Sequence, residues 1–242
     1  MRSLSRAQRR EFVGRGFLPV GRVAALDHLQ VLKGVAAHLA GLDGNPPALD
    51  EDHLMRADRG DVRVALHLCH RSPVFRLNAT GDHIAGMVSD LLGEPAAVLT
   101  SLLFCKPPAV GLPLRLHQDL PYYPYLGDQQ LITCWTALDD ADSDNGAVEY
   151  IPGSHLTRLP HRTTGEQQAL DIPDGAIDTS RATTVPVKAG EAVLHHGLTA
   201  HRSGANHSNR PRMGLATLYV PASVTITADQ FPYPLLTPRS TS

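Results

Sequence analysis

Hydrophobic residues recur at helical spacing through the first part of the chain. Over residues 23–42 they lie three or four positions apart, which is typical of a helix with one buried face. Residues 82–92 repeat the pattern, and Gly93 follows as a residue that commonly ends a helix. A shorter helix is expected after Ser5, a favourable N-cap residue, and Gly14 and Gly16 would end it. Roughly the first 95 residues are therefore predicted to be mainly helical.

After Pro95 the pattern changes to short hydrophobic runs separated by turns rich in Gly, Pro, Asp and Asn. These runs, which we expect to be strands, lie at residues 98–104, 131–138, 147–151, 185–187, 192–196 and 213–220. Helices followed by strands favour an α+β fold with antiparallel sheets, and about eight strands would form a jelly roll. The predicted fold is a double-stranded β-helix, a cupin-like barrel, with the N-terminal helices packed on one sheet.

The length of 242 residues fits a single domain with a sizeable core. We expect a helical layer over about residues 1–95, a jelly-roll core over about 96–221 and a tail over about 222–242. Residues 159–183 form a long polar segment, and segments of that length are often lids or binding loops.

The composition is that of an ordinary soluble protein, with 42% hydrophobic and 19% charged residues. A net charge of -2 gives no support for nucleic acid or an anionic membrane as a partner. No hydrophobic run approaches the ~20 residues that span a bilayer. The N-terminal residues contain no signal-peptide core, so we expect a cytoplasmic location. The oligomeric state stays open.

The three cysteines, Cys69, Cys105 and Cys134, are scattered along the chain and form no Cys-x-x-Cys pair. This arrangement indicates neither a disulfide framework nor a zinc cage. Cys105 and Cys134 lie in hydrophobic runs and are expected to behave as small buried residues.

The triplet His117-Gln118-Asp119 is the most informative short motif. In a strand, residues two apart point to the same face, so His117 and Asp119 would face one point. A histidine from another strand, such as His201, would complete two imidazoles and one carboxylate, a set typical of non-haem Fe(II) oxygenases. In a chain with 13 histidines, the alternative is a surface pair in a turn.

Three stretches together resemble the phytanoyl-CoA dioxygenase family of Fe(II)/2-oxoglutarate oxygenases. They are residues 106–119, residues 135–155 with their Asn145-Gly146 and Pro152-Gly153-Ser154-His155 turns, and residues 190–212. The resemblance covers roughly residues 98–221 in the expected order. The joint occurrence of the three stretches is specific in a way that no single motif is.

The resemblance implies that His117, Asp119 and His201 bind Fe(II). Such a site leaves two positions for a bidentate 2-oxoglutarate and one for O₂. Related halogenases have chloride in place of the carboxylate, so Asp119 favours hydroxylation over halogenation. His195 and His196 are rivals to His201 by composition, and the spacing of the family selects His201.

Arg212 resembles the family's anchor for the distal carboxylate of 2-oxoglutarate, since a guanidinium binds a carboxylate through two hydrogen bonds. Arg210 is the competitor. Pro211 indicates that the strand starts after Arg210, which favours Arg212. Gly214 and Ala216 share the face of Arg212 in a strand, and such small residues would leave room for a co-substrate.

Three further positions match family residues that line the 2-oxoglutarate pocket, and each has a simpler reading. Gln118 points away from His117 if the strand is regular. Trp135, the only tryptophan, serves core packing equally well. Ser203 either binds the co-substrate carboxylate or stabilises a turn.

Four other residues near these motifs are expected to be structural or are left open. His195 is expected only to pack, and His196 either lies beside the site or packs. His155 is expected to make a structural hydrogen bond. Lys106 is expected to be an exposed charge at a strand end. The aromatic loop of residues 121–125 is either a substrate wall or a packed loop.

We therefore predict an Fe(II)- and 2-oxoglutarate-dependent dioxygenase that oxidises a C–H bond of a small molecule or natural product and releases succinate and CO₂. Hydroxylation is the favoured outcome, and desaturation, epimerisation or oxidative cyclisation begin in the same way. One alternative is a cupin-like isomerase or hydrolase that uses Zn²⁺ or Mn²⁺ without O₂. Another is a jelly-roll binding module without activity. The motifs do not identify the primary substrate.

Overall fold

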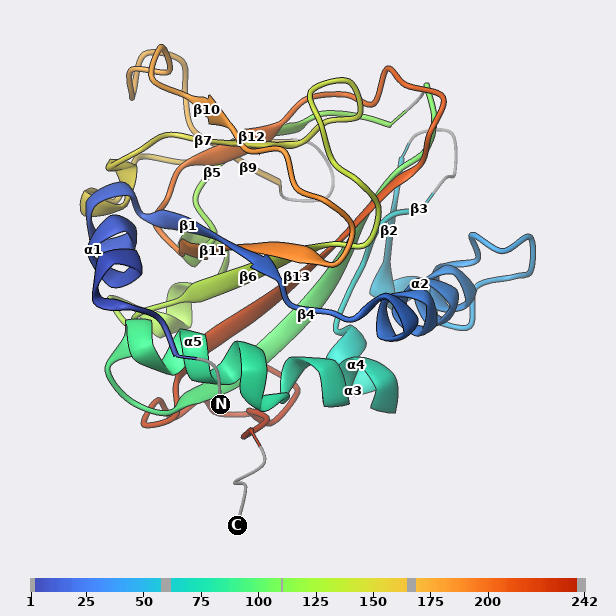
Figure 1. Ribbon diagram of the computed structural model, residues 1–242, viewed down its shortest axis with the longest axis horizontal. Coiled ribbons are helices and arrows are strands. Elements are labelled where there is room, and N and C mark those ends of the chain that lie inside the picture. The colour runs from blue at the N-terminus through green and yellow to red at the C-terminus, as the bar shows by residue number, and fades with distance from the viewer. Residues whose placement is uncertain (1–2, 58–61, 110, 165–168, 239–242) are drawn as a thin grey trace.

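The computed structural model describes residues 3–57, 62–109, 111–164 and 169–238. The helices lie mainly in the first third of the chain (Figure 1): α1 Arg6–Arg15, α2 Leu26–Ala40, α3 Leu68–Arg71, α4 Pro73–Ala79 and α5 Asp82–Leu92. Short 3-10 turns are η1 Glu51–His53, η2 Leu120–Tyr122, η3 Pro124–Leu126 and η4 Ser154–Leu156. No helix among these residues is long and apolar enough to cross a membrane.

The larger sheet has seven strands, and segments distant in sequence lie side by side in it. In spatial order they are β1 Phe17–Arg22, β11 Glu191–His196, β6 Ile132–Ala137, β13 Arg212–Pro221, β4 Ala96–Lys106, β3 Val62–Ala65 and β2 Leu54–Arg56. The two longest strands, β13 and β4, pair along most of their length at the centre of the sheet.

A four-stranded sheet faces the larger one. Its order is β10 Thr183–Thr184, β7 Val148–Tyr150, β12 His201–Ser203 and β5 Leu114–His117. A separate hairpin is formed by β8 Arg162–Thr164 and β9 Ala169–Asp171. All the pairings between these strands are antiparallel, as the α+β prediction requires. The two large sheets are not closed on each other by strand pairing, so the expected barrel is an open double-sheet arrangement.

Strand β6 contributes buried side chains to both faces of the larger sheet. Ile132 and Cys134 belong to a hydrophobic cluster with α1 and α5, whereas Thr133 and Trp135 face the interior cavity. This alternation is the period-2 pattern of a strand that is buried on both faces. All three cysteines are buried and free, as expected for Cys105 and Cys134.

The helices cover the outer face of the larger sheet, as predicted from their hydrophobic stripes. In α2, the buried face holds Leu29, Leu32 and Ala36, which pack with Leu103 and Leu215 of the sheet. Each fully buried leucine contributes about 2 kcal/mol relative to an exposed one. This packing fixes the outer layer, and it leaves the inner face of the sheet free for the cavity.

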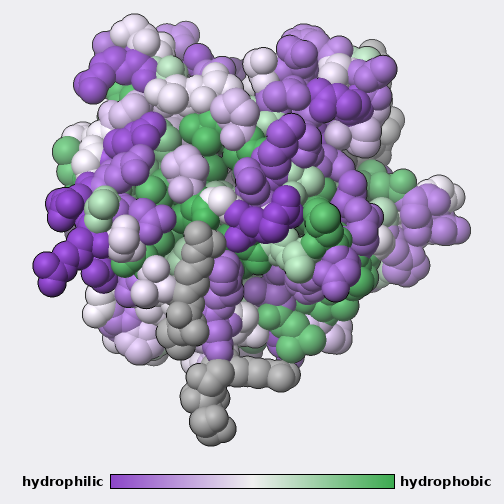
Figure 2. Space-filling model, in the orientation of Figure 1, coloured by the Kyte–Doolittle hydropathy of each residue, from purple (hydrophilic) through white to green (hydrophobic). Residues whose placement is uncertain are grey.

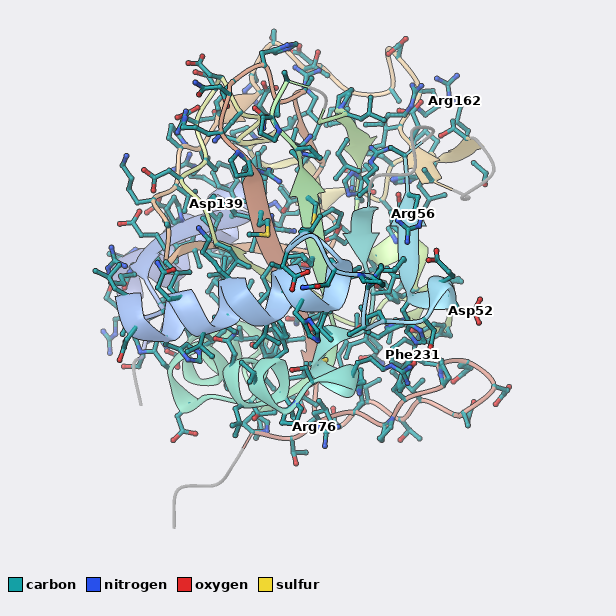
Figure 3. The ribbon with its side chains drawn as sticks, turned by 90° about the vertical axis from the view of Figure 1, so that its right-hand side faces the viewer. Asp52, Arg56, Arg76, Asp139, Arg162 and Phe231 are labelled. Atoms are coloured by element: carbon teal, nitrogen blue, oxygen red, sulfur yellow. The ribbon has the colours of Figure 1, made fainter. Side chains whose placement is uncertain are left out.

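An ion pair ties α2 to the central strands. Lys33 of α2 donates to one oxygen of Asp139, two residues after the end of β6, and the backbone N–H of Met213 donates to the other oxygen. In the side view, α2 runs across the strands, with the labelled Asp139 beside it (Figure 3). Asp139 therefore fixes the start of β13, one residue after Arg212.

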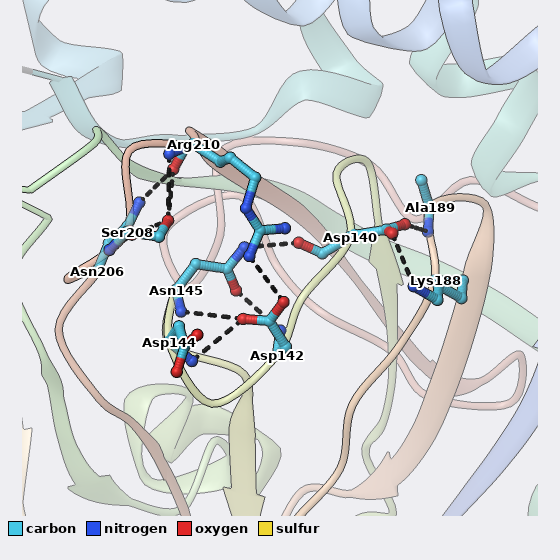
Figure 4. Close-up of polar contacts among 9 residues, drawn as sticks. All are labelled: Asp140, Asp142, Asp144, Asn145, Lys188, Ala189, Asn206, Ser208 and Arg210. Carbon is cyan, nitrogen blue, oxygen red and sulfur yellow. Dashed lines mark hydrogen bonds and ion pairs between the residues drawn. The ribbon is translucent and has the colours of Figure 1, made fainter.

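The turn between β6 and β7 is held by a network of polar contacts (Figure 4). The Arg210 guanidinium donates to Asp142, and the backbone N–H of Asp142 donates to the Asn145 side chain, both at 2.8 Å. Gly146 follows with φ 84°, and a Cβ there would lie 2.5 Å from the Gly204 carbonyl. Only glycine fits this position, and its carbonyl accepts a hydrogen bond from Arg212.

Three parts of the secondary structure differ from expectation. Residues 17–22 form the edge strand β1, although Pro19 and Gly21 obscure the strand pattern, and the register with β11 shifts between these two residues. The predicted lid segment, residues 159–183, contains the β8–β9 hairpin, and its residues 165–168 lie outside the described residues. The predicted strand at 185–187 is displaced to β10, and Val187 makes an isolated bridge with Ala141.

The outer surface is mixed in character. Hydrophilic side chains are spread over the face shown in Figure 2 and are interrupted by smaller hydrophobic areas. This mixture is usual for a globular protein, in which apolar atoms contribute more than half of the accessible surface.

That the whole chain is one domain stays a prediction.

Gly214 of β13 generates a stability prediction, because a Cβ there would lie 2.4 Å from the Trp135 ring. We expect Gly214→Ala to lower the free energy of unfolding by about 1–3 kcal/mol, since the ring has to move. Gly34→Ala in α2, where a Cβ meets nothing within 4 Å, should instead raise it by up to ~1 kcal/mol. Urea unfolding measures both variants, and a Gly214→Ala protein as stable as the parent would contradict the close packing.

Candidate metal centre

The pairing of β5 with β12 brings the two predicted histidine ligands together. His117 is the last residue of β5 and His201 the first of β12, and they are partners in the antiparallel register. Their ring centroids lie 4.2 Å apart. Asp119 lies beyond the strand end with a helical backbone conformation, φ -74° and ψ -42°. The prediction that one regular strand carries both His117 and Asp119 is therefore wrong, and the chain turn after His117 brings the carboxylate to the same point.

Both imidazoles are oriented by backbone carbonyls. His117 Nδ1 lies 2.8 Å from the carbonyl of Arg115, and His201 Nδ1 lies 2.9 Å from that of Thr199. A carbonyl only accepts, so each Nδ1 carries the proton and each Nε2 keeps its lone pair. Both Nε2 atoms face Asp119 Oδ1, at 3.5 Å from His117 and 3.6 Å from His201.

The second oxygen of Asp119 is held by the larger sheet. The Thr133 hydroxyl donates to Oδ2 at 2.7 Å, and the His195 Nε2–H donates to it at 2.9 Å. Burial by itself raises the pKa of Asp119, but the imidazoles of His201, His117 and His195 lower it well below its usual value. Asp119 is therefore a carboxylate with one oxygen anchored and one oxygen directed at the two histidines.

The three side chains fit a divalent metal. Their donor atoms lie within 4.8 Å of one another, and they form the one such cluster found within the described ranges. Burial and the neighbouring His117 lower the pKa of His201 to about 3, which keeps this imidazole neutral and able to ligate. Two neutral nitrogens and one carboxylate oxygen on one side of a metal match the donor set of non-haem Fe(II) sites.

A cavity of about 400 Å³ extends from these three residues between the two sheets. Residues of β4, β6 and β13 line one wall, and residues of β5, β7 and β12 line the other. Of the residues predicted to bind 2-oxoglutarate, Arg212, Ser203 and Trp135 reach this cavity. Its size and its mainly hydrophobic walls suit a small-molecule site.

Arg212 is a buried cation without a carboxylate partner in the described part of the chain. Its side chain is 2% exposed, its Nη2 donates to the Gly146 carbonyl at 2.7 Å, and its Nε has no hydrogen-bond partner there. Burial lowers its pKa to about 10, so it stays charged at neutral pH. A buried guanidinium with an unused donor is a site for an anion. The competitor Arg210 is paired with Asp142 at the surface.

Trp135 shapes the environment of Arg212. The guanidinium lies over the indole ring, 4.9 Å from its centroid, which is a cation–π contact. The ring fills the space left by the missing Cβ of Gly214. The room expected at Gly214 is therefore occupied by Trp135, whereas Ala216 does face the cavity.

Lys106 is not the exposed charge that we expected. It is 6% exposed, and its Nζ donates to the carbonyls of Leu112 and Gly204, both at 2.6 Å. Burial, followed by the charges of Arg212 and Arg63, lowers its pKa to about 7. Lys106 is the register partner of Arg212 and lines the same cavity. Its place in the sequence, before two prolines, gave no signal of this burial.

Gln118 is not brought to the cavity. Its amide nitrogen donates to the carbonyls of Thr157 and Leu198, and its amide oxygen accepts from the backbone N–H of Leu159. The side chain is fully buried, and these three bonds join separate loops. Gln118 therefore points away from His117, the orientation expected for alternate residues, and its geometry is structural.

His195 has a larger part in the site than the packing role we expected. Besides its bond to Asp119, its Nδ1 lies 3.3 Å from the Tyr150 hydroxyl, and both residues line the cavity. Its neighbour His196 points to the other face of β11, where its Nδ1 accepts from the N–H of Leu198. His155 makes the expected structural bond, from Nε2 to the carbonyl of Val13.

The aromatic loop of residues 121–125 follows the metal centre. It both lines the cavity and packs against the core, the two roles that the sequence left open. Tyr122 and Tyr123 line the cavity, and Tyr122 contacts the edge of the His117 ring, with centroids 5.8 Å apart. Tyr125 packs at the edge of the main hydrophobic cluster. The Tyr122 hydroxyl also accepts from the N–H of Leu170, which connects the β8–β9 hairpin to the site.

Sequence reasoning missed three residues that the fold brings to the cavity: Arg63, Thr133 and Tyr150. Their strands, β3, β6 and β7, lie far from the His-x-Asp motif in the sequence. The period-2 pattern of β6 places Thr133 on the face of Trp135, and this is the one signal that was present. The contact of Thr133 with Asp119 needed the tertiary structure.

Two proteins from other organisms are similar in sequence to this chain. A rice protein (Oryza sativa subsp. japonica) named Phytanoyl-CoA dioxygenase 1 is 29% identical over 170 residues, 69% of this chain and 60% of that protein. A "Probable alpha-ketoglutarate-dependent hypophosphite dioxygenase" of Stutzerimonas stutzeri is 34% identical over 147 residues, 58% of this chain and 51% of that protein. The match thus spans between half and about three fifths of these relatives' length.

A solved structure shares the fold over most of the chain. SnoK, a non-heme alpha ketoglutarate dependent carbocyclase from nogalamycin biosynthesis, is 26% identical with a TM-score of 0.72, over 90% of this chain and 85% of SnoK. The family model described as Phytanoyl-CoA dioxygenase (PhyH) matches residues 12–214, which include the His-x-Asp motif, the distant histidine and Arg212. By sequence and by fold, this chain belongs to the phytanoyl-CoA dioxygenase (PhyH) family.

Proposed function

We propose that this protein is an Fe(II)- and 2-oxoglutarate-dependent dioxygenase that oxidises a C–H bond of a small molecule. The observation that carries the proposal is the convergence of His117, Asp119 and His201 at one end of a cavity that also contains the unpaired Arg212. Iron, when bound, supplies the activation of O₂ that no side chain provides. Family membership supports the same chemistry.

The side chains at the metal centre have complementary roles. His117 and His201 present neutral Nε2 atoms because their Nδ1 protons are held by carbonyls. Asp119 presents Oδ1 because Thr133 and His195 hold Oδ2. Such second contacts fix the ligand geometry before the metal arrives, and losing one typically lowers metal affinity 10–100-fold.

The remaining cavity residues position the co-substrate. Arg212 binds the distal carboxylate of 2-oxoglutarate, with Trp135 against its guanidinium face. Ser203 lines the cavity with Arg212 and offers a hydroxyl to the same carboxylate. The hydrophobic walls exclude water from the oxidation. Gln118 takes no part in this proposal, because its amide is used by loop carbonyls.

Hydroxylation is the reaction that Asp119 favours, because its carboxylate occupies the position that halogenases leave to chloride. The name of SnoK, a carbocyclase, illustrates that relatives also direct this chemistry to ring closure. Hydroxylation, desaturation, epimerisation and cyclisation share removal of a hydrogen atom, and the substrate geometry selects among them. A small-molecule substrate used in biosynthesis and a cytoplasmic location stay predictions.

A cupin-like isomerase or hydrolase with Zn²⁺ or Mn²⁺ is the second candidate. It explains the metal ligands equally well, but it gives no function to a buried arginine without an acidic partner. A binding module without activity explains neither feature. Arg212 therefore favours the dioxygenase.

Removal of the carboxylate ligand tests the reaction. With Fe(II), O₂ and 2-oxoglutarate, the protein should release succinate, and Asp119→Ala should reduce this release at least ~100-fold, because two imidazoles alone hold the metal poorly. The control is Asp128→Ala, whose carboxylate is fully exposed. Undiminished succinate release from metal-free protein or from Asp119→Ala would disprove the proposal.

The two neighbouring arginines test the co-substrate site. Arg212→Met should weaken 2-oxoglutarate binding by about tenfold or more, since a charge-assisted hydrogen bond contributes ~1.5–3 kcal/mol. Arg210→Met removes an exposed arginine two residues away and should leave binding unchanged. Calorimetry with the metal present and without O₂ measures both dissociation constants, and equal losses in the two variants would contradict the assignment.

The lowered pKa of Lys106 predicts that 2-oxoglutarate binding depends on pH. Its pKa of about 7 in the free protein should rise when the dianion enters the cavity. Below pH 7 the lysine is protonated in both states. Above pH 7 binding has to take up a proton, so the dissociation constant should increase by up to about tenfold per pH unit.

The control for this pH effect is a lysine outside the cavity. Lys106→Met should bind 2-oxoglutarate with little pH dependence between pH 7 and 9, whereas Lys188→Met, which loses an exposed lysine paired with Asp140, should keep the parent's slope. Calorimetry in two buffers of different ionisation enthalpy measures the proton uptake directly. An unchanged slope in Lys106→Met assigns the titration to another group.

A further inference from the structure

The cavity beside the metal centre carries more positive than negative side chains. Four cationic residues of the described ranges line it, namely Arg63, Lys106, Arg202 and Arg212. Among the described lining residues the one carboxylate is that of Asp119. Arg202 is already neutralised, because its Nε donates to Glu149 at 2.7 Å. An excess of positive charge therefore faces the interior.

Arg63, on β3, is the cation whose function is not explained by the metal centre or the co-substrate. It is half-buried, and its Nη2 donates to the carbonyl of Pro113 at 2.5 Å. No ion pair of the described residues includes it, whereas the neighbouring Arg115 is near Asp171. Burial, with the like charge of Arg115, lowers the pKa of Arg63. Removing part of a guanidinium from water costs free energy unless an anion pairs with it, and here a ligand would supply that anion.

Arg63 and Tyr122 line the cavity that leads to the metal centre. The Tyr122 ring contacts the edge of the His117 ring, with centroids 5.8 Å apart. All three residues line the same cavity. A molecule whose charged end contacts Arg63 therefore extends along Tyr122 towards the place where oxidation occurs.

The loaded site has no negative charge left for Arg63 to neutralise. A divalent metal, the Asp119 carboxylate and the 2-oxoglutarate dianion together leave one negative charge, and Arg212 offsets it. Lys106, which is protonated once 2-oxoglutarate has bound, adds one positive charge while it donates to two backbone carbonyls. Arg63 thus remains available for a further anion after the co-substrate has bound.

We propose that Arg63 binds an anionic group, a carboxylate or a phosphate monoester, of the primary substrate. The rest of that substrate is hydrophobic, because the cavity walls around this charge include Met55, Val64, Leu66, Leu112 and Leu114. This inference rests on the proposed function and narrows it to amphipathic small acids. The C–H bond that is oxidised then lies at a fixed distance from the acidic group of the substrate. The span from Arg63 to His117 sets that distance.

The test compares matched acids and neutral molecules. The protein is loaded with Fe(II) and 2-oxoglutarate without O₂, and calorimetry measures the binding of hexanoate, 4-phenylbutyrate and hexyl phosphate, together with the two primary amides and hexanol. We expect at least one acid to bind about tenfold or more tightly than its neutral partner, the range of a charge-assisted hydrogen bond. The carboxylate and phosphate arms distinguish the two kinds of acid.

Variants then assign this preference to one side chain. Arg63→Met should reduce the ratio of the two affinities to about one, and Arg63→Lys should keep part of it, because a lysine retains the charge but not the two-pronged geometry. Arg115→Met is the matched control, since Arg115 is an exposed arginine nearby that does not line the cavity. It should leave the ratio unchanged.

Three outcomes overturn the inference. One is a parent protein that binds no acid more tightly than its neutral partner, or that binds neither the acids nor their neutral partners. Another is an Arg63→Met protein that keeps the preference. The third is loss of 2-oxoglutarate affinity in Arg63→Met, which would place Arg63 in the co-substrate site. Titration of 2-oxoglutarate alone comes first: if the parent does not bind it, the proposed function fails together with this inference, and if it does, only the inference is at stake.

Discussion

The hydrogen-bonded pairing of β5 with β12 is the constraint on which the metal centre depends. It places His117 opposite His201, and each ring is turned by a carbonyl two residues before it in the chain. Both histidines therefore present Nε2 without any further adjustment. The larger sheet contributes Thr133 and His195, which hold the carboxylate of Asp119. The site exists only because two sheets face each other, and each sheet fixes a different ligand.

The same arrangement buries charges that a stability-optimised core would avoid. Asp119, Lys106 and Arg212 are largely removed from water, and transferring each ion into the interior costs several kcal/mol. Imidazoles and a hydroxyl offset this cost at Asp119, and one carbonyl and an indole face offset it in part at Arg212. A metal ion and an anionic co-substrate would supply the remaining compensation, so ligand binding and stability are coupled in this fold.

Much of the fold follows from local patterns. The helix at residues 82–92, the Ser5 cap and the order of the main strands were predictable, because hydrophobic period and capping chemistry act over a few residues. The edge strand β1 was not, because Pro19 and Gly21 weaken its pattern and its pairing with β11 supplies the missing stability. The roles of Lys106 and His195 were not predictable either, since burial and distant partners decide whether a charged or polar side chain packs, binds or is solvated.

The sequence by itself determined the chemical inventory: a His-x-Asp motif, a later histidine, an arginine at the start of a strand, and the family that carries these in order. Those features are local, and spacing along one chain is enough to recognise them. Only the tertiary structure decided that Asp119 lies past the strand end, that His195 and Thr133 hold it, that Gln118 faces away, and that Arg63 enters the cavity. These are contacts between distant strands, and their geometry depends on how two sheets pack, which no local pattern encodes.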